Sequence, residues 1–126
     1  RGLHFQNNPQ AQTKLVRCTK GRIWDVAVDL RKNSPTYLKW FGLELTAENH
    51  KMLLVPQGFA HGFITLRDNT IVQYLVDNDY SPESEGSIVW TNFEMIKVKI
   101  ENLVGNFDEN DITISDKDLV TKNFKL

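Results

Sequence analysis

Apolar and polar residues alternate with a period of two along most of this chain, and this pattern constrains the fold more than any other feature. In 23–30, for example, Trp24, Val26, Val28 and Leu30 share one face. Short segments of this kind recur about every ten residues, separated by turn residues, as in a β-barrel or β-sandwich. The predicted strands are 1–6, 14–19, 23–30, 40–45, 51–55, 59–66, 70–76, 87–90 and 95–100.

Turn and cap residues divide the pattern. Pro56, Pro82 and the glycines fall between the predicted strands. The segment 67–69 is a short loop suited to a hairpin between 59–66 and 70–76. The stretch 103–111 is polar, and Ser115 precedes Asp118 by three residues, which resembles a helix N-cap with an acidic N3 residue. We therefore expect a short C-terminal helix from about Asp116.

Composition excludes several classes of protein. The 126 residues favour one domain, and a net charge of -1 gives no bulk electrostatic attraction to nucleic acid or a membrane surface. No apolar run approaches the ~20 residues of a membrane span. Cys18 is the only cysteine, so no intrachain disulfide or thiolate metal cluster is expected, and the chain fits a reducing cytoplasm. An anionic ligand would have to be met by a few placed cations.

Two basic residues on predicted strands have both a structural and a functional interpretation. His4 shares a strand face with Gly2 and Gln6. A lone histidine is more often structural, but a face of small residues carrying a histidine also suits an open barrel lumen. Lys14 begins a strand, where lysines usually extend into water. If its side chain points inward, its ammonium would favour a negative ligand or a developing oxyanion.

A metal site is a weaker interpretation of the histidines. His4, His50 and His61 could converge, but neither a His-x-His pair nor a His-Glu-x-x-His motif occurs. Tyr74 has the alternation of a core or interface tyrosine, and Tyr80 lies in a loop where it could stack on a planar ligand. A nucleophile elbow, a phosphate-binding glycine loop and nucleic-acid motifs are absent from the sequence.

Several motifs together resemble the dTDP-4-dehydrorhamnose 3,5-epimerase family. They occur in order from Arg1 to about Leu119 with small gaps. Each is weak alone, and their combination is specific. They are 1–6 (RGLHFQ), 14–18 (KLVRC), 25–31 (DVAVDLR) with 34–36 (SPT), 47–49 (AEN), 56–63 (PQGFAHGF), 80–82 (YSP), 85–86 (EG) and 115–118 (SDKD).

The resemblance implies a mainly β, cupin-type jelly-roll barrel that forms a homodimer and needs neither a cofactor nor a metal. It also implies epimerisation at C3 and C5 of dTDP-4-keto-6-deoxy-D-glucose, a dTDP-linked 4-keto-6-deoxyhexose, on the route to dTDP-L-rhamnose. By position, the resemblance makes His4 the general base, Asp118 its acidic partner, Lys14 the cation beside the ketone oxygen and Tyr74 the proton donor. Ligand-binding positions are Arg1, His61, Glu85 and Lys117, with Tyr80 stacking on the thymine.

The chain departs from the family pattern in three places. The sequence reads as a single cupin-type epimerase domain, residues 1–126, without the N-terminal segment that family members carry before the Arg1 motif. Thr91-Asn92 and Ile100-Glu101 replace the usual aspartate and Trp-Pro. Arg1 and His4 are three residues apart, so a regular strand would direct them to opposite faces unless Arg1 lies at the strand mouth or the chain kinks at Gly2.

Three alternatives therefore remain for the function. One is an epimerase acting at C3 or C5 alone, or on another nucleotide-linked sugar. Another is a metal-dependent cupin oxygenase or isomerase. The last is a nucleotide-sugar binding module without catalytic activity.

Overall fold

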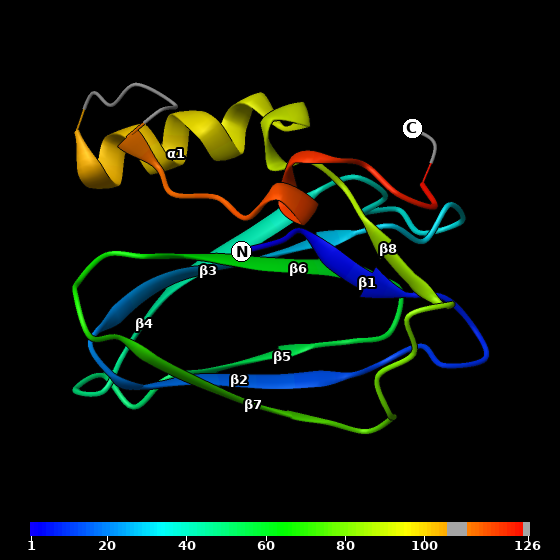
Figure 1. Ribbon diagram of the computed structural model, residues 1–126, viewed down its shortest axis with the longest axis horizontal. Coiled ribbons are helices and arrows are strands. Elements are labelled where there is room, and N and C mark those ends of the chain that lie inside the picture. Colours follow the sequence, from blue (N-terminus) through cyan, green and yellow to red (C-terminus); the bar gives the residue numbers. More distant parts are fainter. Residues whose placement is uncertain (106–110, 125–126) are drawn as a thin grey trace.

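Two antiparallel sheets face each other in the computed structural model, which describes residues 1–105 and 111–124 (Figure 1). Sheet A has the strand order β4-β3-β6-β1-β8, and sheet B has the order β5-β2-β7. The strands are β1 (His4–Gln6), β2 (Lys14–Lys20), β3 (Arg22–Asp29), β4 (Trp40–Thr46), β5 (Met52–Val55), β6 (Phe59–Thr65), β7 (Ile71–Val76) and β8 (Glu85–Ser87).

Strand β3 is buried on both faces and separates two apolar cores. Trp24, Val26 and Val28 face outward from sheet A and belong to one core. Ile23 and Ala27 face the space between the sheets, where they join Val16 of β2 in the second core. The predicted shared face of Trp24, Val26 and Val28 is confirmed, and the opposite face of the same strand lines the lumen.

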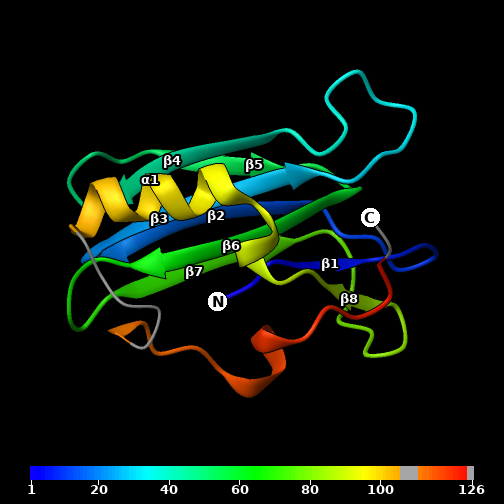
Figure 2. The ribbon, with the colours of Figure 1, turned by 90° about the horizontal axis from the view of Figure 1, so that it is seen from above.

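The expected strand at 95–100 is wrong, because these residues form part of helix α1 (Glu94–Val104). Ile96 and Ile100, one turn apart, are its buried residues, and they pack on the outward core of sheet A. Gly105 ends the helix with a positive φ of 84°. Figures 1 and 2 show α1 lying over the outer face of sheet A, on the side away from sheet B.

The expected hairpin across 67–69 is also wrong. Strand β6 pairs with β3 and β1 in sheet A, whereas β7 pairs with β2 in sheet B. The loop therefore carries the chain from one sheet to the other instead of reversing it within a sheet. Val72 of β7 packs in the core between the sheets, which is the contact that this crossing makes possible.

The C-terminal part of the chain only partly matches the expectations. Among the described residues the last strand is β8, Glu85–Ser87, and Trp90 begins a 3₁₀ helix, η1 (Trp90–Asn92), instead of ending a strand. A short helix does begin at Asp116, as a 3₁₀ helix, η3 (Asp116–Leu119), with Ser115 at its N-cap position. Of the polar stretch expected at 103–111, Leu103 and Val104 end α1, and residues 106–110 lie outside the described part of the chain.

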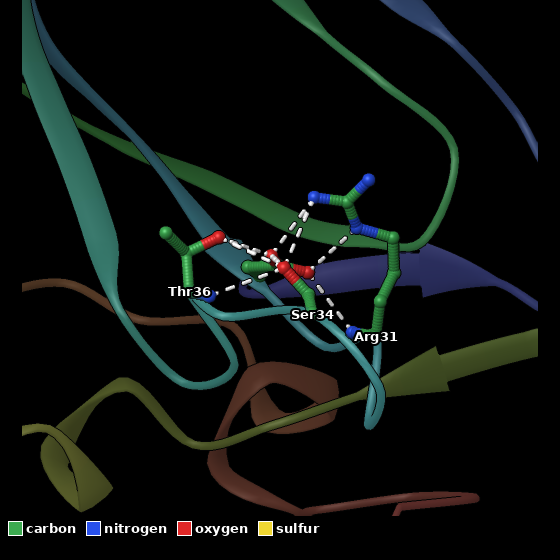
Figure 3. Close-up of polar contacts among 4 residues, drawn as sticks. Arg31, Ser34 and Thr36 are labelled. Atoms are coloured by element: carbon green, nitrogen blue, oxygen red, sulfur yellow. Dashed lines mark hydrogen bonds and ion pairs between the residues drawn. The ribbon is translucent and has the colours of Figure 1, made fainter.

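A buried carboxylate fixes the loop at the end of β3. Asp29, which is 1% exposed, accepts two hydrogen bonds from the guanidinium of Arg31, both at 2.9 Å, and one each from the hydroxyls of Ser34 and Thr36 at 2.6 Å. Figure 3 shows these side chains converging on one point. The guanidinium also stacks over the ring of Phe59, 4.8 Å from its centroid. The loop is thereby held against one end of the barrel.

None of the helices in the described residues is long and apolar enough to cross a membrane.

Candidate active site

The space between the two sheets gathers four of the nine predicted site residues, His4, Lys14, His61 and Tyr74. His4 of β1 lies opposite His61 of β6 in sheet A. Across the lumen, Lys14 of β2 shares a strand face with Val16, which is fully buried between the sheets. Tyr74 lies directly opposite Val16 on β7, so it presents the same face. The site thus takes polar side chains from both sheets.

His4 forms a close pair with Asp118. Its Nε2 lies 2.5 Å from Oδ1 of Asp118, which is 2% exposed. The other oxygen of Asp118 accepts a hydrogen bond from the backbone N–H of Gly2 at 3.3 Å. Helix η3 therefore folds back over β1, and Asp118 is more than the capping residue that the tail alone suggested.

The pKa shifts of this pair favour a neutral imidazole beside an ionised carboxylate. Burial lowers the pKa of His4 below its ordinary value of 6.5, and the nearby charge of Asp118 offsets only part of this. Burial raises the pKa of Asp118, but the hydrogen bonds from Ser115, Gly2 and His4, together with the positive charge of His4 when it is protonated, bring it below its ordinary value. An ionised Asp118 accepts the Nε2–H of His4, which leaves Nδ1 with a free lone pair.

Lys14 points into the lumen. Burial lowers the pKa of its ammonium below the ordinary value, and the negative charges of Glu85 and Asp25 offset part of this effect. A lysine extended into water would not be desolvated in this way. The inward orientation brings a cation into the same cavity as His4.

Three further predicted residues lie around the mouth of the site. Glu85 of β8 is opposite Gln6 of β1, and its charge raises the pKa of His4. Lys117, next to Asp118 on η3, lowers it. Tyr80 is 64% exposed, and its hydroxyl donates to Oε2 of Glu85 at 3.2 Å.

Two predicted residues are less enclosed. Tyr74 is 50% exposed and lies on β7, an edge strand of sheet B among the described residues. Arg1 is exposed, and its backbone pairs with that of Phe63. Strand parity does not apply between Arg1 and His4, because φ is 107° at Gly2 and β1 begins only at His4.

A second buried pair, His61 with Asp25, was not predicted as a pair. Nε2 of His61 lies 2.7 Å from Oδ1 of Asp25, and Asp25 has no exposed surface. Oδ2 of Asp25 is buried without a hydrogen-bond partner in the part of the chain that the structure describes. The sequence carries a partial signal, because a carboxylate in the apolar segment 23–28 needs a partner if it is buried, but the sequence does not identify that partner as His61.

No three His, Cys, Asp or Glu side chains within residues 1–105 and 111–124 are grouped so as to hold a metal ion. His4 and His61 are neighbours in sheet A, whereas His50 is an exposed residue between β4 and β5. A cavity of about 710 Å³ lies elsewhere, between α1 and the outer face of sheet A, where Trp24 and Ile96 line it.

Comparison with known proteins identifies the family of this fold and site. A family model described as dTDP-4-dehydrorhamnose 3,5-epimerase matches residues 1–125. The chain belongs to the dTDP-4-dehydrorhamnose 3,5-epimerase family. A protein of that name from Salmonella typhimurium is 55% identical over 92 residues, which are 73% of this chain and 50% of the relative.

Solved structures of the family superpose on nearly the whole chain. The enzyme from Bacillus anthracis, with TDP and PPi bound, is 48% identical with a TM-score of 0.81, over 96% of this chain and 65% of that one. The Legionella pneumophila epimerase in complex with dTDP-4-keto-L-rhamnose is 37% identical with a TM-score of 0.76, over 94% and 58%. The predicted cupin-type jelly roll is thereby confirmed, and the chain spans about half to two-thirds of the length of these relatives.

Proposed function

We propose that this domain catalyses epimerisation at C3 and C5 of dTDP-4-keto-6-deoxy-D-glucose, giving dTDP-4-keto-L-rhamnose, without a cofactor. The His4–Asp118 pair, with 2.5 Å between Nε2 and Oδ1, is the observation that carries this proposal. A neutral histidine held in one tautomer by an ionised carboxylate is suited to general base catalysis near neutral pH.

Proton abstraction is the first chemical step of the proposal. A C–H bond next to a ketone is a weak acid, so its cleavage requires stabilisation of the enolate oxygen that forms. Nδ1 of His4 accepts the proton, and the charge on its ring is balanced by Asp118. The ammonium of Lys14, already desolvated in the lumen, stabilises the enolate oxygen.

Reprotonation from the opposite face completes the inversion. Tyr74 lies on sheet B, across the lumen from His4 on sheet A, so a sugar ring between the sheets would have the two groups on opposite faces. The Tyr74 hydroxyl donates a proton to the carbon from which His4 removed one. After the first inversion, His4 releases its proton to solvent and the Tyr74 phenolate takes one up, so the two carbons next to the ketone can use the same base, acid and cation in turn.

The nucleotide would bind at the mouth of the site. Arg1 and Lys117 supply positive charge for the diphosphate, Glu85 supplies a further polar contact, and His61 contacts the ligand from within the lumen. Tyr80, which is exposed, would stack on the thymine. The relatives with TDP and with dTDP-4-keto-L-rhamnose bound support a thymidine nucleotide as the carrier.

Proton NMR of the purified protein with dTDP-4-keto-6-deoxyglucose tests the proposal. We expect resonances of the C3,C5-inverted sugar to appear, and the His4→Asn variant to form none. Inversion at C3 or C5 alone would instead show a mono-epimerase. Binding of dTDP without any inversion would show the binding module without catalytic activity. Unchanged turnover in protein treated with a chelator would argue against the metal-dependent alternative.

We further infer that the protein acts as a homodimer in the cytoplasm. The outer face of sheet B exposes large apolar side chains, including Ile71, Leu54 and Leu75, which supports burial by a second copy. The single buried thiol of Cys18 is compatible with a reducing compartment. Sedimentation equilibrium and fractionation of the source cells would test these two statements, and a monomeric mass or a membrane-bound fraction would contradict them.

A further inference from the structure

Gln6, two residues after His4 on β1, is buried and makes three hydrogen bonds to backbone groups of two loops. Its Nε2 donates to the carbonyl of Gln10 at 2.5 Å and to that of Asp79 at 3.1 Å. Its Oε1 accepts from the backbone N–H of Ser81 at 3.0 Å. The orientation of the amide is unambiguous, because a carbonyl can only accept and a backbone N–H can only donate.

Two of these bonds fall on either side of Tyr80. The carbonyl of Asp79 precedes this residue and the N–H of Ser81 follows it, so the Gln6 amide closes a ring of hydrogen bonds around the Tyr80 backbone. The side chain of Tyr80 is itself 64% exposed, and within the described residues its one side-chain hydrogen bond runs from its hydroxyl to Glu85. Its direction is therefore set mainly by its backbone.

We propose that Gln6 is a positioning residue, which holds the ring of Tyr80 in the orientation that stacks on the nucleobase. This inference rests on the proposed function, since it requires a planar base at Tyr80. We call the three hydrogen bonds from Gln6 to Gln10, Asp79 and Ser81 the Gln6 clamp. An aromatic ring that is oriented before the ligand arrives loses less conformational entropy on binding, so the clamp should strengthen nucleotide affinity. Gln6 itself would not touch the sugar or change the chemical step.

These three hydrogen bonds require glutamine at position 6, because they need two N–H donors and one acceptor at the end of a side chain of this length. In Gln6→Glu an oxygen replaces Nε2 and faces the carbonyls of Gln10 and Asp79, so two hydrogen bonds are lost. In Gln6→Met the shape is kept and all three bonds are lost. The two variants break the clamp in different ways, so agreement between them separates the loss of the clamp from the effect of an added charge.

Gln12 provides a matched control. It is also a glutamine that joins the same two loops, with Nε2 donating to the carbonyl of Asn78 at 2.8 Å, but it does not bracket Tyr80. Gln12→Met removes one inter-loop hydrogen bond without freeing the backbone on both sides of the tyrosine. A general loosening of the loops would affect dTDP binding in both glutamine variants.

Calorimetric titration with dTDP tests the inference on the wild type, Gln6→Glu, Gln6→Met, Gln12→Met, Tyr80→Ala and the double variant Gln6→Met with Tyr80→Ala. Because stacking of one base contributes about 1–3 kcal/mol, we expect Kd for dTDP to rise about tenfold in either Gln6 variant. KM for the nucleotide sugar should rise in parallel, with kcat nearly unchanged. Gln12→Met should leave Kd within about twofold of the wild type.

The double variant decides whether Gln6 acts through Tyr80. If it does, Gln6→Met adds nothing to the loss already caused by Tyr80→Ala. Additive losses, or an unchanged Kd in folded Gln6 variants, would overturn the inference. Wild-type protein that binds dTDP but inverts no carbon contradicts the proposed catalysis and leaves this titration decisive, whereas wild-type protein that does not bind dTDP contradicts both.

Discussion

The protonation state of His4 determines when the proposed base can act. Only the neutral imidazole accepts a proton, and burial places the pKa of His4 below 6.5. We therefore expect kcat/KM to be constant near neutral pH and to decrease as pH falls through a value below 6.5. A profile of kcat/KM against pH in overlapping buffers measures this. Loss of activity already above pH 6.5, in protein that remains folded, would contradict the assignment.

Asp118 should affect both the maximum of the profile of kcat/KM against pH and the pH at which its acid limb falls. Asp118→Asn keeps the shape of the side chain but removes the charge that raises the pKa of His4 and fixes its tautomer. We expect kcat to fall at least about 100-fold and the acid limb to move to lower pH. Ser115→Ala is a milder comparison, because it removes only one of the interactions that lower the pKa of Asp118.

The role of Tyr74 as proton donor can be distinguished from the role of His4 as base by a single substitution. Tyr74→Phe keeps the ring on β7 and removes the proton that it would donate. We expect this variant to retain proton abstraction and to be impaired in forming the product inverted at C5. Mass spectrometry after reaction in deuterated water measures exchange, and NMR measures product. Loss of all exchange in Tyr74→Phe would show that the tyrosine does not act as the acid.

Part of the site could be predicted residue by residue. Strand parity places Lys14 on the face of Val16 and Cys18, and that face proved to line the lumen. The pairing of His61 with Asp25 could not be predicted, because it depends on which strands lie side by side, and β3 and β6 are far apart in sequence.

Among the elements, α1 shows how a short pattern misleads. Ile96, Val98 and Ile100 alternate as in a strand, yet Ile96 and Ile100 are also spaced by one helical turn, and over six residues the two interpretations compete. The burial of the side chains agrees with the helix, since Ile96 and Ile100 are buried and Val98 is only half-buried. The helix is favoured because it covers the apolar outer face of sheet A.

Substitutions in α1 test this packing. Ile96→Ala should lower the free energy of unfolding by about 2–4 kcal/mol, because it leaves a cavity against sheet A. Met95→Ala, at an exposed neighbouring position, should change it by less than about 0.5 kcal/mol. Urea denaturation followed by far-UV circular dichroism gives both values. Equal losses would be inconsistent with the helix as described.

The loop after β3 depends on the charge of Asp29. Asp29→Asn replaces an acceptor with a donor facing Arg31, Ser34 and Thr36, so we expect a loss of about 2–4 kcal/mol at neutral pH. The hydrogen bonds from Arg31 hold the pKa of Asp29 well below its ordinary value of 3.8, so this stabilisation is complete above pH 3.8 and is lost as pH falls below it.

Urea midpoints of the wild type and Asp29→Asn at pH 7 and pH 3 measure that dependence, with Asp68→Asn as an exposed control. The difference between wild type and Asp29→Asn should be smaller at pH 3. A difference that stays constant between the two pH values would contradict a role for the ionised carboxylate.

For the whole molecule, the sequence predicts the class of fold better than its connections. Period-two alternation and regularly spaced turns suffice for a barrel or sandwich. The passage of the chain between sheets at 67–69 depends on long-range pairing, so the local turn signal suggested a hairpin instead. The return of η3 over β1, which brings Asp118 to His4 across 114 positions, is likewise a property of the complete fold.

In the proposed mechanism, His4, held by Asp118, removes protons from both carbons that flank the ketone. Incubation of the folded protein with dTDP-4-keto-6-deoxyglucose in deuterated water, followed by mass spectrometry of the sugar, measures this directly. We expect deuterium at both C3 and C5 with the wild type and at neither carbon with His4→Asn. Absence of deuterium with the wild type, or undiminished exchange with His4→Asn, would contradict it.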